Sequence, residues 1–220
     1  MKSERKDQLF LGFEAEQDLA EYPKADSVLM PDADVVLFRD FFEKEESDLL
    51  FVELLNKIEW KQDRIKYYGK EMDLPRLTAW YGDSGASYTY SNISMNSTVW
   101  TPTLMCIKEK IEKMTGASFN SVLLNYYRHG RDSVSWHRDN EPELGKNPVI
   151  ASVSFGETRR FQFKHIKRKE LGRVDVELTH GSLLVMQGTT QEFWLHQIPK
   201  TSKPIKPRVN LTFRRILEKV

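Results

Sequence analysis

Apolar positions follow a helical period in two segments in the first half of the chain. Residues 43–60 carry Leu50, Leu54 and Ile58 on one face, which predicts an amphipathic helix. A second helix is predicted over residues 101–116, because Thr101 precedes a proline at its start and a glycine closes it. Each helix has one apolar face and must pack it against another element.

The rest of the pattern favours short strands. A β-branched and aromatic run predicts a first strand at residues 34–42. Beyond residue 119, seven further runs separated by turns predict strands at 122–127, 149–155, 160–164, 174–178, 182–186, 192–197 and 208–216. This order predicts an α+β fold with a mainly β core, a sandwich or barrel whose N-terminal helices pack against one sheet.

The length of 220 residues fits one domain with an N-terminal extension. We expect residues 1–30 to form a flexible tail and residues 31–220 to form the domain. Within it, residues 60–95 combine turn residues with several tyrosines. Those rings either pack inward or offer stacking faces to a flat ligand.

Composition excludes several classes of protein. Hydrophobic residues make up 40% and charged residues 30%, which argues against wholesale disorder. The net charge of +1 means that a nucleic-acid partner would need a local basic cluster. Cys106 is the single cysteine, which excludes an internal disulfide and a cysteine-based zinc cluster, and its apolar neighbours predict a buried, inert side chain. With no membrane-spanning run or signal peptide, we expect an intracellular monomer, cytoplasmic in a bacterium or nuclear in a eukaryote.

His137 and Asp139 are the first residues that indicate chemistry. If residues 133–142 are extended, side chains at i and i+2 share a face, so the imidazole and the carboxylate can converge on one ion. A second histidine would complete the two-histidine, one-carboxylate set that binds non-heme Fe(II). The tripeptide alone is weak evidence for a metal site, because His-x-Asp arises often by chance.

His196 is the candidate for the third ligand. It lies in an apolar run that suits a strand facing the core, although it could equally be a core histidine with a structural role. The remaining histidines fit the site less well. His129 and His180 each precede a glycine in a turn, and His165 lies in a basic stretch that would disfavour a bound cation.

Polar residues on two other predicted strands suit a dicarboxylate. Arg208, Asn210 and Arg214 share one face of the last strand, and buried guanidinium groups need an anionic partner. Asn125 and Tyr127, two residues apart, add hydrogen-bonding groups. The alternative is an exposed edge strand whose arginines are solvated.

Taken in order, these motifs resemble the AlkB family of Fe(II)- and 2-oxoglutarate-dependent dioxygenases. The resemblance covers most of the chain from about residue 67 onward, and several segments most resemble the animal member that repairs duplex DNA. It implies a double-stranded β-helix of the jelly-roll or cupin kind. It also implies Fe(II) on His137, Asp139 and His196, with 2-oxoglutarate and O2 as cosubstrates. The residues implied for 2-oxoglutarate are Asn125, Tyr127, Arg208, Asn210 and Arg214.

The resemblance further implies oxidative demethylation of 1-methyladenine and 3-methylcytosine in DNA, with release of formaldehyde. Such a base must be extruded from the duplex to be reached. Tyr90 and His137 would stack on it, Tyr88 would line its pocket and Glu141 would bind its exocyclic amine. Tyr68 would be an aromatic finger that fills the gap in the duplex.

Further contacts with nucleic acid are implied outside the base pocket. Arg76 would grip the opposite DNA strand. A set of basic residues would either contact phosphates or lie in solvated loops: Lys164, Lys167, Arg168, Lys169 and Lys203. An alternative function is the same chemistry on an RNA or protein substrate. A third hypothesis, a binding module without catalysis, is disfavoured by the complete ligand set.

Residues 8–13 resemble short peptides that dock on the DNA sliding clamp. The alternative is that this segment folds back on the domain.

Overall fold

The computed structural model describes residues 24–67, 70–83, 87–90, 93–96 and 98–217. Its larger sheet has seven strands, which pair antiparallel throughout. In sheet order they are β1 (Ala25–Ser27), β2 (Asp34–Phe38), β13 (Ser182–Gln187), β10 (Ile150–Gly156), β15 (Arg208–Arg214), β8 (Ser121–Tyr127) and β5 (Leu77–Gly82).

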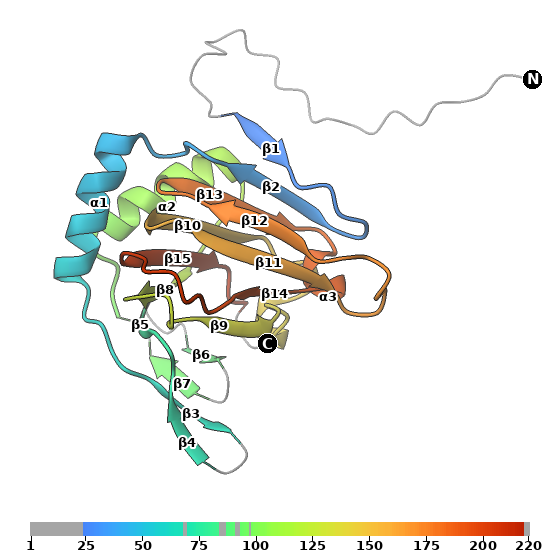
Figure 1. Ribbon diagram of the computed structural model, residues 1–220. Coiled ribbons are helices and arrows are strands. Elements are labelled where there is room, and N and C mark those ends of the chain that lie inside the picture. The colour runs from blue at the N-terminus through green and yellow to red at the C-terminus, as the bar shows by residue number, and fades with distance from the viewer. Residues whose placement is uncertain (1–23, 68–69, 84–86, 91–92, 97, 218–220) are drawn as a thin grey trace, which may run out of the picture.

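A four-stranded antiparallel sheet faces the larger one. Its order is β12 (Val174–Leu178), β11 (Arg159–His165), β14 (Trp194–Ile198) and β9 (Val134–His137). The two layers make the jelly-roll core that the family resemblance implies (Figure 1). All seven strands predicted beyond residue 119 are present, with ends that differ by a few residues.

Helices and hairpins surround the two sheets. Helices α1 (Lys44–Lys57) and α2 (Pro102–Thr115) lie beside the larger sheet, while hairpins β3–β4 and β6–β7 lie at one end of the domain (Figure 1). The hairpin strands are β3 (Arg64–Tyr67), β4 (Lys70–Asp73), β6 (Ser87–Tyr90) and β7 (Ile93–Asn96), and the short helices are η1 (Pro142–Leu144) and α3 (Thr190–Phe193). The hairpins occupy most of residues 60–95, where the sequence shows turn residues and several tyrosines, and β7 extends one residue beyond that range.

The start and end of α2 match its sequence signals. The side-chain oxygen of Thr101 accepts a hydrogen bond from the Leu104 amide at 3.2 Å, and Gly116 ends the helix at a φ of 67°. The apolar face of α2 packs into a core with α1 and one face of the larger sheet. A second core fills the space between the sheets and includes Phe163, Leu184 and Trp194.

Strand β15 separates these two cores. Val209, Leu211 and Phe213 belong to the helix-side core, whereas Arg208 and Arg214 line a cavity between the sheets. All seven residues of β15 are buried, and the strand pairs with β10 on one side and β8 on the other. The alternative of an exposed edge strand with solvated arginines is therefore wrong.

Three features differ from the sequence predictions. Strand β1 pairs with β2, so part of the expected tail of residues 1–30 joins the larger sheet. Cys106 is exposed rather than buried, because the apolar face of α2 is formed by neighbouring positions such as Leu104 and Ile107. Helix α3, which precedes β14, was not predicted. Across the described ranges, every helix is too short or too polar to span a bilayer.

The helix-side core gives the first prediction. Leu211→Ala should lower the free energy of unfolding by about 2 to 5 kcal/mol, because it removes a fully buried side chain from a central strand. Leu49→Ala is the matched control, since Leu49 is 75% exposed on α1 and should change stability by less than about 0.5 kcal/mol. Urea unfolding measures both, and similar losses for the two variants would contradict the assigned core.

Candidate active site

Strands β9 and β14 bring His137 and His196 together. The two residues are directly opposite in the antiparallel ladder, and their ring centroids are 4.3 Å apart. Asp139 follows two residues after His137. One potential ligand atom from each of the three residues lies within 4.8 Å of the others. The predicted i and i+2 convergence of imidazole and carboxylate is therefore present in the structure.

Hydrogen bonds show which atoms face the site. The Nδ1 atom of His137 is 2.8 Å from the Ser135 carbonyl oxygen, so Nδ1 carries the proton and leaves the Nε2 lone pair free. The Nε2 atom of His196 is 3.9 Å from Oδ2 of Asp139. Phe161 stacks on the His196 ring with centroids 5.1 Å apart and fixes its plane.

Burial sets the protonation states of the three side chains. It lowers the pKa of His137, and it lowers the pKa of His196 to about 3. Burial alone would raise the pKa of Asp139, but the Arg214 guanidinium and the two histidines outweigh it, so that pKa is lowered. At neutral pH the cluster therefore offers two neutral imidazoles and one carboxylate, a donor set that fits Fe(II).

The five residues predicted to hold 2-oxoglutarate line the same cavity as the three metal-ligand candidates. Strand register explains this grouping. On neighbouring strands β8 and β15, Tyr127 lies opposite Arg208, and Asn125 lies opposite Asn210. Two polar pairs thus face the space between the sheets.

Arg208 has unused hydrogen-bonding capacity. Its side chain is 1% exposed, and its Nη2 atom donates to Ser154 Oγ at 2.8 Å. Its Nε and Nη1 atoms have no hydrogen-bond partner among the described residues. Burial lowers the pKa of Arg208 to about 10, so the group is charged at neutral pH. A buried cation with free donors in a cavity is suited to a carboxylate ligand.

Arg214 occupies a different position from Arg208. Its Nη2 atom donates to Oδ1 of Asp139 at 2.8 Å, and both side chains are buried. Arg214 was expected to hold 2-oxoglutarate. In the structure it lines the cavity while it pairs with the carboxylate of the metal cluster.

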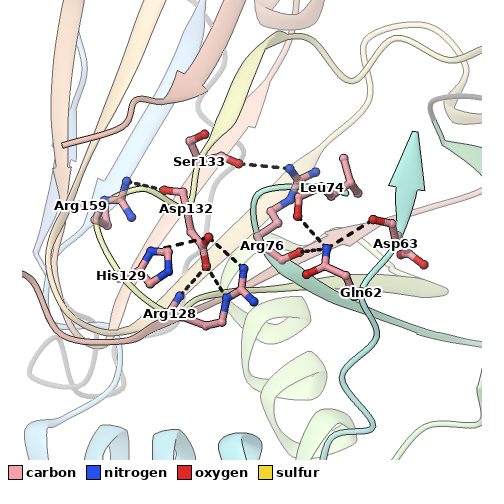
Figure 2. A network of polar contacts seen from close by, with 9 residues as sticks. All are labelled: Gln62, Asp63, Leu74, Arg76, Arg128, His129, Asp132, Ser133 and Arg159. Carbon is pink, nitrogen blue, oxygen red and sulfur yellow. Dashed lines mark hydrogen bonds and ion pairs between the residues drawn. The ribbon is translucent and has the colours of Figure 1, made fainter. Parts of the chain in front are cut away.

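Arg76 is buried, although we expected it to grip a DNA strand. It is 3% exposed and lines the cavity, with Nε donating to Asn125 Oδ1 at 2.6 Å and Nη1 donating to the Ser133 carbonyl oxygen at 3.2 Å. Figure 2 shows its guanidinium turned toward Ser133. Two internal partners hold the Arg76 side chain inside the domain, and its contact with a DNA strand stays a prediction.

The loop that leads into β9 is fixed by side chains (Figure 2). The Asp132 carboxylate accepts hydrogen bonds from the backbone amide and the guanidinium of Arg128. Arg159 donates to the carbonyl oxygens of Asp132 and Pro199. Residues 128–133 therefore position the start of the strand that carries His137.

Two residues that support the site were not predicted from the sequence. The side-chain oxygen of Gln191 on α3 accepts a hydrogen bond from the Asp139 amide at 3.0 Å, and Gln191 is 2% exposed. The guanidinium carbon of Arg159 lies 5.5 Å from the centroid of the Tyr127 ring. No motif marks either residue. The one sequence feature that could have indicated them is a polar residue at a position expected to face the core, close to a strand that carries a metal-ligand candidate.

The predicted base-pocket residues are described only in part. Tyr68 lies outside the described residues, and of Tyr88 and Tyr90 the structure describes the β6 backbone only. Glu141 is half-buried at the start of η1. Their predicted roles therefore stay predictions.

The predicted phosphate-binding residues differ in environment, and Lys203 is distant in sequence from the other four. Lys167, Arg168, Lys169 and Lys203 are exposed. Arg168 forms ion pairs with Glu170 and Asp32. Lys164 is half-buried, with Nζ 4.7 Å from the centroid of a Trp136 ring.

Comparison with known proteins agrees with this geometry. The family model described as 2OG-Fe(II) oxygenase superfamily matches residues 34–214. A solved structure, "The structure of OsALKBH1", superposes with a TM-score of 0.63 over 87% of this chain and 100% of that chain, at 15% identity, and supports the fold alone. Fold and ligand cluster together define a 2OG-Fe(II) oxygenase domain.

Curated relatives narrow this class. The chain is 44% identical over 195 residues to alpha-ketoglutarate-dependent dioxygenase alkB homolog 3 of Bos taurus, covering 83% of this chain and 66% of that protein. It is 40% identical over 185 residues to DNA oxidative demethylase ALKBH2 of Homo sapiens, covering 80% and 71%. The chain belongs to the AlkB family, as its motifs predicted. It spans just under two thirds of the length of the alkB homolog 3 proteins.

The buried imidazole of His196 gives a prediction of pH dependence. Its folded pKa of about 3 is below the ordinary 6.5, so the unfolded chain binds more protons between these values and stability falls as the pH falls through that window. Between pH 7.5 and pH 5 this one group should cost the metal-free protein about 2 kcal/mol. His196→Leu should lose less stability over that interval, measured by urea unfolding. An equal loss in both proteins would contradict the neutral, buried state of His196.

Proposed function

We propose that this protein is an Fe(II)- and 2-oxoglutarate-dependent demethylase that repairs 1-methyladenine and 3-methylcytosine in DNA. The observation that carries the proposal is the convergence of His137, Asp139 and His196 in a cavity where Arg208 has free guanidinium donors. The names of the relatives, alpha-ketoglutarate-dependent dioxygenase and DNA oxidative demethylase, support the same chemistry.

The metal would be held by the two imidazoles and Asp139. This ligand set leaves coordination positions open for small ligands. When bound there with 2-oxoglutarate and O2, Fe(II) supplies the oxidising power that hydroxylates an N-methyl group. The chain contributes neutral imidazoles, which need not lose a proton before they ligate.

The cosubstrate would be held by side chains from β8 and β15. Arg208 offers Nε and Nη1 to the far carboxylate of 2-oxoglutarate, next to Tyr127 and Asn210. Asn125 on the neighbouring strand β8 would add a hydrogen bond. Arg214 keeps the Asp139 carboxylate ionised and oriented. The same contacts would also hold succinate, the product of oxidative decarboxylation by O2.

The nucleic-acid substrate would approach past residues 60–95. A methylated base must leave the stack to reach a cavity between two sheets, and tyrosines such as Tyr88 and Tyr90 would stack on the flipped, positively charged base. Tyr68 would fill the gap in a duplex, and Glu141 would bind the exocyclic amine. The exposed basic residues Lys167, Lys169 and Lys203 would meet phosphates. Hydroxylation of the N-methyl group gives an adduct whose carbon–nitrogen bond breaks to release formaldehyde.

The direct test is formaldehyde release from methylated single-stranded DNA, duplex DNA and RNA, measured side by side at one salt concentration. Asp139→Ala should abolish release from every substrate, because it removes the one anionic ligand of the cluster. Asp175→Ala is the matched control, since Asp175 is an exposed carboxylate on β12, and it should retain activity. Activity that survives Asp139→Ala would contradict the proposed metal site, and activity on RNA alone would move the substrate class to RNA.

Arg208 gives a second prediction. Arg208→Ala should raise the 2-oxoglutarate concentration needed for half-maximal turnover at least about tenfold, because hydrogen bonds to a charged group contribute roughly 1.5 to 3 kcal/mol. Arg160→Ala is the control, because Arg160 is exposed on β11 and pairs only weakly with Asp175 at 3.5 Å. An unchanged requirement in Arg208→Ala would show that the cosubstrate binds elsewhere.

A further inference from the structure

We propose that Arg76 is a positioning residue for the cosubstrate, because it holds the Asn125 amide with its nitrogen directed into the cavity. This inference rests on the proposed function, which assigns that cavity to 2-oxoglutarate. It gives Arg76 a role inside the domain instead of at the DNA surface.

The contacts of Arg76 are short and internal. Its Nε atom is 2.6 Å from Asn125 Oδ1, in a hydrogen bond between two residues that are 3% and 6% exposed. Both side chains line the cavity that contains His137, Asp139 and His196. The guanidinium is therefore directed toward internal partners and not toward the protein surface.

The chemistry of the guanidinium decides the orientation of the amide. An arginine N–H can donate a hydrogen bond but cannot accept one, so the amide oxygen of Asn125 must face Arg76. The amide nitrogen is then the end that remains for a ligand in the cavity. Without Arg76, the amide could turn about its last torsion and present the oxygen instead, at little steric cost.

This orientation matters for a carboxylate or keto ligand. Such a ligand offers only acceptor oxygens, so a nitrogen donor from Asn125 stabilises it and an amide oxygen repels it. Arg76 therefore acts on cosubstrate affinity through Asn125. Its own charge adds to the positive potential of a cavity that already contains Arg208 and Arg214.

The backbone around Arg76 is held from two sides (Figure 2). The Gln62 side-chain nitrogen donates to the carbonyl oxygens of Leu74 at 2.7 Å and Arg76 at 3.3 Å, at the base of hairpin β3–β4. The Ser133 amide donates to the Pro75 carbonyl oxygen at 2.8 Å, and Arg76 Nη1 donates back to the Ser133 carbonyl oxygen. These bonds restrict the guanidinium to one direction, which a positioning role requires.

A double-mutant cycle tests the inference. The affinity for 2-oxoglutarate is measured by calorimetry on the full chain with Mn(II) in place of Fe(II), for the unsubstituted protein, Arg76→Met, Asn125→Ala and the double variant. Arg76→Met should weaken binding about tenfold, the effect of one hydrogen bond to a charged group. In the Asn125→Ala background the same change should have a much smaller effect, which is the direct contribution of the lost charge alone. Arg160→Met is the matched control and should bind 2-oxoglutarate like the unsubstituted protein.

The outcomes separate the possible roles. Losses that multiply in the double variant, or a loss confined to methylated-oligonucleotide affinity measured by fluorescence anisotropy, would overturn the positioning role. If Arg76→Met does not fold, Asn125→Asp replaces it, because an aspartate still accepts from Arg76 but has no N–H for the ligand. Asn125→Asp should bind 2-oxoglutarate more weakly than Asn125→Ala, and unchanged binding would overturn the inference. Failure of the unsubstituted protein to bind 2-oxoglutarate would overturn the proposed function as well.

Discussion

Buried charge around one carboxylate is the constraint on which the site depends. Arg76, Arg208 and Arg214 line a cavity in which Asp139 is the one acidic side chain among the described lining residues. Taking guanidinium groups out of water is costly unless partners compensate them. Arg214 has Asp139 and Arg76 has Asn125, whereas Arg208 keeps two donors without partners among the described residues. The fold therefore holds an excess of positive charge that a bound dicarboxylate would offset.

The position of β15 holds its buried arginines, Arg208 and Arg214, in the cavity. A strand paired on both sides cannot twist its inward residues toward water, and its opposite face anchors it to the helices through Leu211 and Phe213. Strand β9 is different. It lies at the edge of the smaller sheet, and its ladder with β14 shifts register between His196 and Ile198. His137 and Asp139 consequently depend on loop contacts, such as the bond from the Asp139 amide to Gln191.

Periodicity in the sequence was enough to predict seven of the eight described strands beyond residue 119, both main helices and the shared face of Arg208 and Arg214, because these follow from local patterns. Strand β9 was not among the predicted runs. Tertiary burial was not predictable in the same way. Arg76 is read as a surface arginine until its partner Asn125, 49 residues away, is known to lie beside it. The prediction that Cys106 is buried was wrong for a related reason, since its apolar neighbours in sequence lie on another side of α2. Gln191 belongs to a helix of four residues, too short to show a period.

The contact between Arg214 and Asp139 has a consequence for how the carboxylate could bind a metal. Arg214 takes Oδ1, while Oδ2 is the oxygen that faces His196. With Oδ1 bound to Arg214, the carboxylate would favour binding a metal through Oδ2 alone. Monodentate binding uses one coordination position instead of two. The position saved is then available to a chelating keto acid or to dioxygen, so an arginine that never touches the metal would help determine how many small ligands the metal can accept.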